Sequence, residues 1–245
     1  SLGAEFKIEK DTVYVKGISY SNDSPILNCN ESGSTLRFLL PLATQFSNKV
    51  TFKTEGKLSS RPLNVYENIF KIIRHNNETN SEGKLEGGIY EIDGSISSQF
   101  ISGLLFLLPL LNNDSVILIK NKISSLSYIL MTIKLLKEFK INIDFDIQNK
   151  KILIRGNQKY KKVEYVVEND FSQASFFLGL GAISSNPITV SGLNMESLQP
   201  DKNIINILQL MGAKLIIKED QVTVYKSNLK KTTISLDENP DLGPI

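Results

Sequence analysis

Leu135-Leu136-Lys137-Glu138-Phe139-Lys140-Ile141 has a counterpart about 70 residues further along the chain, Ile207-Leu208-Gln209-Leu210-Met211-Gly212-Ala213. In both stretches an apolar run with helical spacing ends and a strand pattern begins. This period is longer than that of solenoid repeats, so it indicates a few large units packed together. Each unit reads helix, strand, helix, strand, strand, and the sequence therefore predicts an α+β (α/β) fold.

Apolar spacing alternates between the strand period and the helix period along the whole chain. Strands are predicted at residues 6–9, 12–16, 50–53, 84–85, 89–92, 115–119, 141–146, 151–155, 188–191, 214–218 and 221–225. Helices are predicted at residues 34–46, 63–74, 98–108, 126–139, 171–183 and 202–211. Asp170 and Gln173 are spaced for a capping box, and Gly212 suits a helix C-terminus.

The passage from one unit to the next, around residues 164–170, is the expected domain boundary. Residues 5–167 then form most of a substrate-binding domain with more than two units, and residues 168–245 form part of a second domain. Residues 1–4 begin without Met, and we expect them to be a cloning remnant or linker.

Composition excludes several classes of function. The 245 residues carry a formal net charge of +2 with both signs interleaved, which predicts no nucleic-acid partner. The most apolar stretch, 104–111, is too short to span a bilayer. Because the chain has almost no Cys, a cytoplasmic location is expected. The chain is also expected to be a monomer. One Cys and one His leave no zinc cluster or disulfide framework, so any chemistry uses Asp, Glu, Lys, Arg, Ser or Tyr.

The lone Cys29 and the lone His75 are each interpreted without a catalytic role. Cys29 follows apolar Ile26-Leu27, which favours a small buried side chain over a nucleophile. His75 precedes Asn76-Asn77 and is expected at the solvated end of a helix.

Three short segments rich in Ser or Gly stand at the starts of apolar helices or beside Arg: Glu31-Ser32-Gly33-Ser34-Thr35-Leu36-Arg37, Leu58-Ser59-Ser60-Arg61-Pro62 and Ser97-Ser98-Gln99-Phe100. Free backbone N–H groups at a helix start attract anions, and Arg adds a planar charged fork. The pattern predicts a site for a phosphorylated small molecule. Each residue also has a plainer interpretation: the serines cap helices, Arg61 is a solvated surface residue, and Asp241 is a turn residue.

These segments, taken in order, resemble the 5-enolpyruvylshikimate-3-phosphate synthases (3-phosphoshikimate 1-carboxyvinyltransferases). The first is similar to the family's Asn-Ser-Gly-Thr-Thr-Met-Arg motif, and three further matches support it: Ser125-Leu126-Ser127-Tyr128, the interdomain segment 167–178, and Pro240-Asp241-Leu242. Each match alone is weak, but their joint order over nearly the whole chain is specific.

The resemblance implies the enolpyruvyl transferase fold, an α/β prism of repeated βαβαββ units in two globular domains. It also implies transfer of the enolpyruvyl group of phosphoenolpyruvate to the 5-hydroxyl of shikimate 3-phosphate, with no metal or organic cofactor. The implied substrate-binding residues are Gly33, Ser34, Arg37, Arg61, Ser97, Ser98, Gln99, Ser125 and Tyr128.

Within that set, Gly33, Arg61 and Gln99 would contact phosphoenolpyruvate. Ser97, Ser98, Gln99 and Ser125 would hold shikimate 3-phosphate, against which Tyr128 would stack. Asp241 would be the catalytic residue that accepts the proton of the attacking hydroxyl.

The chain departs from the family pattern in three places. Glu31 stands where the family often has Asn, so it either faces away from the ligand or pairs with an Arg. The family's N-terminal Lys-Ser-x-x-x-Arg segment and its C-terminal Lys, Glu and Arg residues have no counterpart here. We therefore expect an internal fragment that binds shikimate 3-phosphate weakly and is inactive alone.

Two alternatives stay open at the level of sequence. A UDP-N-acetylglucosamine enolpyruvyl transferase shares the repeated unit, although Cys29 does not occupy the place of its usual catalytic Cys. A non-catalytic module that binds a phosphometabolite would use the same scaffold. RNA 3′-phosphate cyclase shares the broad fold, and the lack of a basic patch disfavours it.

Overall fold

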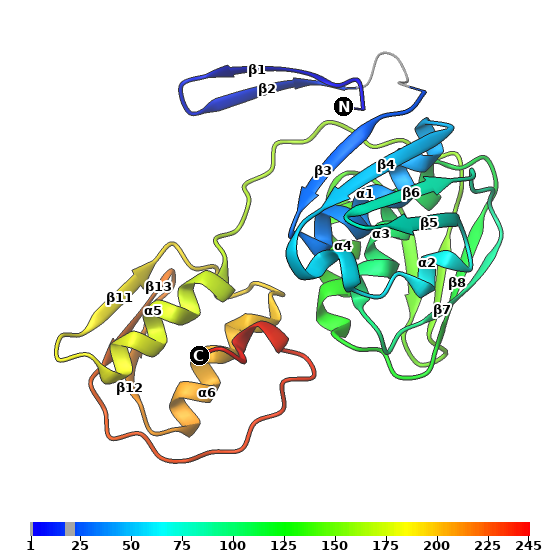
Figure 1. Ribbon diagram of the computed structural model, residues 1–245. Helices are drawn as coiled ribbons and strands as arrows, with labels where there is room; N and C mark the ends of the chain where they lie inside the picture. Colours follow the sequence, from blue (N-terminus) through cyan, green and yellow to red (C-terminus); the bar gives the residue numbers. More distant parts are fainter. Residues whose placement is uncertain (1, 18–22) are drawn as a thin grey trace. The chain divides into compact units, whose positions relative to one another are not determined.

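The computed structural model describes residues 2–17 and 23–245, and the chain divides into two compact units (Figure 1). Unit 1 contains residues 1–122 and 140–161, and unit 2 contains residues 123–139 and 162–245. The predicted α+β class is confirmed, because helices and several separate sheets alternate along the chain.

The first four-stranded sheet of unit 1 has the strand order β3-β4-β6-β5. β3 and β4 are parallel and are joined by α1, whereas β6 runs antiparallel to both β4 and β5. Its elements are β3 (Ile26–Asn30), α1 (Gly33–Phe46), β4 (Lys49–Thr54), the 3₁₀ helix η1 (Gly56–Ser60), α2 (Asn64–Glu67), β5 (Lys71–His75) and β6 (Glu78–Glu82).

The second four-stranded sheet repeats this topology with the order β7-β8-β10-β9. β7 and β8 are again parallel and joined by a helix, α3, and the other pairs are antiparallel. The elements are β7 (Ile89–Asp93), α3 (Ser98–Leu107), η2 (Leu108–Leu110), β8 (Ser115–Lys120), α4 (Leu126–Glu138), β9 (Ile143–Asp146) and β10 (Lys151–Ile154), of which α4 lies in unit 2. The recurrence of one βαβαββ topology confirms the predicted repeat.

Unit 2 contains the last helix, strand, helix, strand, strand series that the sequence predicts. Its three strands form an antiparallel sheet with the order β11-β13-β12. The elements are α5 (Phe171–Ile183), β11 (Ile188–Ser191), η3 (Pro200–Asn203), α6 (Ile204–Leu210), β12 (Lys214–Ile217), β13 (Gln221–Tyr225) and η4 (Pro240–Leu242).

Two helices, α1 and α3, pack against each other in the core of unit 1. They meet closely at Gly103, where an added Cβ would stand 2.4 Å from the carbonyl oxygen of Arg37 and 2.3 Å from the hydroxyl of Tyr66. The fully buried Tyr66 lies edge-on to Phe100, with ring centroids 4.8 Å apart. Only glycine fits at position 103, so this contact fixes how near the two helices come.

The core of unit 2 forms where α5 packs against β11 and β13. Phe171, Leu178, Val222 and Val224 are buried in it together with the apolar face of α6. The start of α5 matches the sequence prediction, because the Asp170 side chain accepts hydrogen bonds from the backbone N–H groups of Ser172 and Gln173.

The predicted helix at 63–74 is wrong. The chain forms only the short α2 there and then the strand β5, which pairs with β6 through a two-residue turn at Asn76-Asn77. Asn76 has a φ of 50°, a left-handed conformation that Asn tolerates. His75 is exposed as expected, but it ends a strand and not a helix.

Two strand predictions also need correction. No strand forms at 84–85; the strand is β6, a polar segment in which Thr79 and Ser81 are the buried residues. The strand β3 was not predicted, because its alternation rests on Leu27 and Cys29 alone. Cys29 is buried as expected, and burial raises the pKa of its thiol to about 11.

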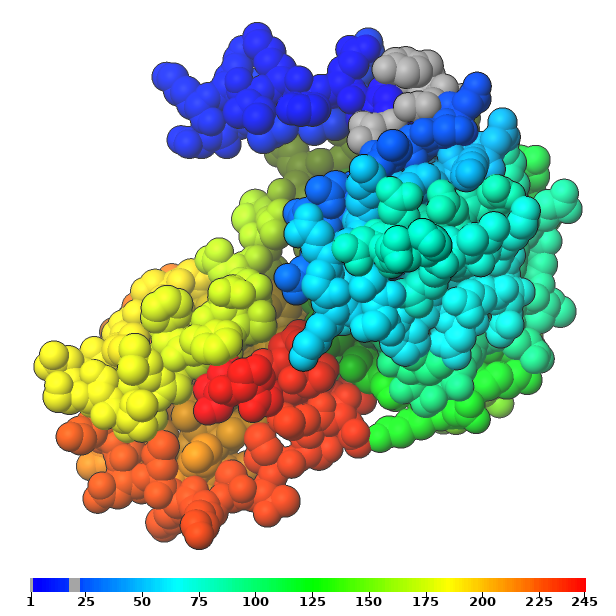
Figure 2. Space-filling view, in the orientation of Figure 1, coloured from blue at the N-terminus to red at the C-terminus, as the bar shows by residue number. Residues whose placement is uncertain are grey.

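The hairpin of β1 (Glu5–Glu9) and β2 (Thr12–Lys16) exposes its apolar side chains, including Phe6, Ile8 and Val15. Figure 2 shows this N-terminal part of the chain in dark blue. No helix within the described ranges is long and apolar enough to cross a membrane.

Candidate functional site

The start of α1 lies beside two arginine side chains in unit 1. A Cβ added at Gly33 would stand 3.1 Å from Nη1 of Arg61, 3.5 Å from Nη1 of Arg37 and 3.6 Å from Oε1 of Gln99. Glycine at this position therefore leaves the space between these side chains and the helix N-terminus open. Three of the predicted site residues, from three separate segments of the sequence, thus surround Gly33.

Ser32 caps α1 by accepting a hydrogen bond from the backbone N–H of Thr35 at 3.1 Å. The hydroxyl of Ser34 lies 3.2 Å from that of Ser32. α1 has 14 residues, so its N–H groups and dipole give a partial positive charge at Gly33.

Arg37 is buried at the centre of the group, with 7% of its surface exposed. Its Nη1 donates to Oε1 of Gln99 at 2.7 Å, and its guanidinium lies 4.8 Å from the centre of the Phe100 ring. Nε of Arg37 has no hydrogen-bond partner among the described residues. Burial lowers the pKa of Arg37, and the charge of Arg61 lowers it further.

Within residues 2–17 and 23–245, no ion pair links Arg37 or Arg61 to a carboxylate. Two guanidinium groups that approach each other without a counterion repel, and a bound anion relieves that repulsion. Glu31 does not supply a negative charge to the two arginines. Its carboxylate lies against the backbone of Gly56, where both carboxylate oxygens are within 2.9 Å of the position that a Cβ on Gly56 would occupy. We call Gly33, Arg37, Arg61 and Gln99 the arginine group.

Ser97 and Ser98 lie at the start of α3, next to Gln99. Ser97 is the N-cap residue and accepts a hydrogen bond from the backbone N–H of Gln99 at 3.3 Å. Ser98 is buried. Because Gln99 also bonds Arg37, the start of α3 is joined to the arginine group.

The remaining predicted residues, Ser125, Tyr128 and Asp241, belong to unit 2. Tyr128 Oη lies 2.8 Å from Oδ2 of Asp201 and 3.1 Å from Oδ2 of Asp241. Ser125 has a φ of 55° at the start of α4, and its hydroxyl lies 3.5 Å from the carbonyl oxygen of Asp237. The structure therefore brings Tyr128 and Asp241 together, and it adds Asp201, which the sequence interpretation missed.

Asp201 is buried, whereas Asp241 is exposed. Burial raises the pKa of Asp201, and the charges of Asp241 and Asp170 raise it further, against hydrogen bonds from Tyr128 and from its own backbone N–H that lower it. The pKa of Tyr128 lies far above its ordinary value, first because of burial and then because of its contacts with Asp201 and Asp241. We call Tyr128, Asp201 and Asp241 the tyrosine group.

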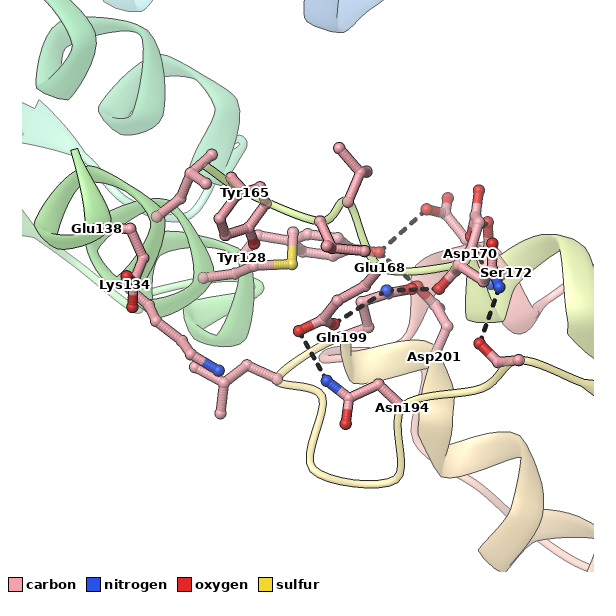
Figure 3. Close-up of a pocket in the computed structure, with 18 of the residues that line it drawn as sticks. Tyr128, Lys134, Glu138, Tyr165, Glu168, Asp170, Ser172, Asn194, Gln199 and Asp201 are labelled. Atoms are coloured by element: carbon pink, nitrogen blue, oxygen red, sulfur yellow. Dashed lines mark hydrogen bonds between the residues drawn. The ribbon is translucent and has the colours of Figure 1, made fainter. Parts of the chain in front are cut away.

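A hollow of about 1040 Å³ in unit 2 is lined by this group and by polar residues that precede α5 (Figure 3). Glu168 accepts hydrogen bonds there from Ser197 and from Asn194, the latter at 3.0 Å, and the bond from Ser197 is the main cause that lowers its pKa. Glu168 was also not predicted as a site residue, although it stands inside the recognised 167–178 segment. No cluster of three or more His, Cys, Asp or Glu residues suited to a metal ion occurs among the described residues.

Comparisons with known proteins agree with the motif resemblance. The family model for EPSP synthase (3-phosphoshikimate 1-carboxyvinyltransferase) matches residues 1–245. A protein of Clostridium perfringens (strain SM101 / Type A) named 3-phosphoshikimate 1-carboxyvinyltransferase is 42% identical over 255 residues, and one of Clostridium kluyveri with the same name is 41% identical over 253. All of this chain is covered in both matches, but only 60% and 59% of those relatives.

Two solved structures of EPSP synthase from Acinetobacter baumannii match with a TM-score of 0.69 and 17% sequence identity. The matches cover 99% of this chain and 59% and 60% of the two solved chains. At this identity the structures support the fold, and the family model and the closer relatives carry the assignment. The chain belongs to the EPSP synthase (3-phosphoshikimate 1-carboxyvinyltransferase) family.

Proposed function

We propose that this chain contributes to the transfer of the enolpyruvyl group from phosphoenolpyruvate to the 5-hydroxyl of shikimate 3-phosphate. The observation that carries the proposal is the arginine group, in which two guanidinium groups without a carboxylate partner among the described residues approach a helix N-terminus. Both substrates carry phosphate, and phosphoenolpyruvate also carries a carboxylate. These are the anions that paired N–H donors and helix starts bind best.

In this proposal Gly33, Arg61 and Gln99 contact phosphoenolpyruvate. Arg37 holds Gln99 in place through the 2.7 Å hydrogen bond and adds positive charge. Ser97 and Ser98, at the start of α3, bind the phosphate of shikimate 3-phosphate with neutral donors.

The tyrosine group supplies the proton acceptor. The 5-oxygen adds to C2 of phosphoenolpyruvate as a proton adds to C3, and the adduct then loses that C3 proton and phosphate, which restores the double bond. The hydroxyl proton passes to the carboxylate of Asp241, whose exposure leaves it open to a substrate. Ser125 and Tyr128 contact shikimate 3-phosphate from the start of α4.

A cytoplasmic location follows from the same proposal, and the unpaired, buried Cys29 supports it.

The test is calorimetric titration of the chain with each substrate, comparing wild type with Arg61→Gln. A charge-assisted hydrogen bond contributes about 1.5–3 kcal/mol, so the substitution should weaken phosphoenolpyruvate binding roughly tenfold to a hundredfold. Arg155→Gln, an equal change of charge at an exposed residue of unit 1, should leave the affinity unchanged. Equal affinity for wild type and Arg61→Gln would remove the arginine group from the proposed site.

A further inference from the structure

The tyrosine group has fewer protons than its contacts require. Tyr128 Oη is within hydrogen-bond distance of a carboxylate oxygen on each side, at 2.8 Å from Asp201 and 3.1 Å from Asp241. A phenol has one proton, which it can donate to only one carboxylate. If the other short O···O contact is also a hydrogen bond, its proton must come from a protonated carboxylic acid.

Asp201 is the member that can hold this proton. Only 3% of its surface is exposed, and its second oxygen, Oδ1, is buried and has no hydrogen-bond partner among the described residues. A charged carboxylate with a buried, unpaired oxygen is costly, and a neutral acid avoids most of that cost. The carboxylate of Asp241 is exposed to water, so its charged form carries no such burial penalty.

The charges around Asp201 also favour a proton on its carboxyl group. Asp241 on η4 and Asp170 at the start of α5 both act on it as like charges. The Nζ of the neighbouring Lys202 donates to the backbone oxygen of Met195 at 2.8 Å, and Lys202 forms no ion pair with Asp201 among the described residues. Among the described residues, Tyr128 on α4 is the remaining titratable group that contacts Asp201, and its high pKa keeps it neutral.

We propose that Asp201 is a neutral, protonated acid that donates to Tyr128 Oη, so that Tyr128 donates in turn to Oδ2 of Asp241. Asp201 is then a positioning residue. It orients the hydroxyl of Tyr128, which holds one oxygen of Asp241 and leaves the other free as a proton acceptor. The catalytic part of this inference rests on the proposed function; the protonation state of Asp201 does not.

Infrared spectroscopy of the chain without ligand tests the protonation state directly, by the carbonyl stretch of a protonated carboxylic acid. At about pH 6.5 an ordinary Asp or Glu is ionised, so few other groups contribute. The band should be present in wild type and in Asp220→Asn, a control that removes an exposed carboxylate from unit 2. It should be absent from Asp201→Asn, whose amide can still donate to Tyr128.

Asp241→Asn should keep the band but move its titration to lower pH, because a neighbouring negative charge is gone. A band that survives in Asp201→Asn and is lost in Asp241→Asn would place the proton on Asp241 and overturn the proposal. These results do not depend on substrate, so a failure of the calorimetric test leaves them unaffected.

The pH dependence of unfolding serves as a second measurement if Asp201→Asn does not fold. An acid whose pKa is raised in the folded state gives stability that is lost as pH rises through that pKa, by up to tenfold in the folding equilibrium per pH unit. Wild type should show this loss, and Asp241→Asn should show it at lower pH. A profile that is identical in the two proteins would contradict the proposal.

Discussion

Tyr66→Phe removes a hydroxyl that completes the hydrogen bonding of α1. The backbone oxygen of Arg37 would normally bond the N–H of the residue four positions later, but that residue is Pro41, which has no N–H. Tyr66 Oη lies 2.9 Å from this oxygen and also 2.9 Å from the backbone oxygen of Phe100 on α3. One buried hydroxyl thus substitutes for the missing donor of α1 and contacts both helices.

The expected cost follows from what the substitution leaves unpaired. A buried carbonyl oxygen that loses its partner costs about 1–3 kcal/mol, and the phenyl ring of Phe preserves the packing against Phe100. For a unit of this size, each kcal/mol lowers the melting temperature by roughly 2–4 °C. Gly103→Ala should cost more, because its Cβ would lie 2.3 Å from the Tyr66 hydroxyl.

Urea and thermal unfolding of unit 1 measure these effects. Tyr14→Phe is the matched control, since Tyr14 is an exposed residue of β2. Tyr66→Phe should lower the midpoint and Tyr14→Phe should not. Equal midpoints for the two variants would refute the idea that the hydroxyl of Tyr66 replaces the missing N–H of Pro41.

Two other predictions concern titratable groups. Glu168→Gln should lower the free energy of unfolding of unit 2 at neutral pH. Because hydrogen bonds lower the pKa of Glu168, the extra stability of wild type should be lost as pH falls below about 4. Denaturant titrations in which the two proteins differ equally at all pH values would contradict this prediction. Cys29 should react slowly with thiol reagents in the folded chain at pH 8, because burial raises the pKa of its thiol to about 11. Labelling is followed by absorbance, and rapid labelling of the folded chain would contradict this prediction.

Much of the fold could be predicted because apolar periodicity marks most of the helices and strands and because a polar side chain caps the start of α1, α3 and α5. α5, β2, β11 and β13 have the predicted bounds, since apolar periodicity, a capping Asp and short loops agree there. The prediction failed at 63–74, where the apolar residues fit helical spacing although the chain forms only the short helix α2 and then the strand β5. Asn76-Asn77 is a turn signal, but β6, the strand that follows it and pairs with β5, is a polar segment without the apolar alternation that predicts a strand.

The arginine group could be predicted only in part. Sequence motifs identified Gly33, Arg37, Arg61 and Gln99 separately, and the structure supplies their proximity. Tyr66 and Asp201 had no local signal, because their roles arise from contacts with residues 29 or more positions away. A polar side chain that is buried only by tertiary packing looks the same in sequence as one on the surface.

Amide chemical shifts of the chain titrated with shikimate 3-phosphate and phosphoenolpyruvate would show whether the arginine group binds an anionic substrate. The largest saturable shifts should occur at the backbone amides of Gly33, Ser34 and Gln99, and Arg61→Gln should reduce them. Shifts confined to residues away from the starts of α1 and α3, or equal shifts in wild type and Arg61→Gln, would contradict binding at the arginine group.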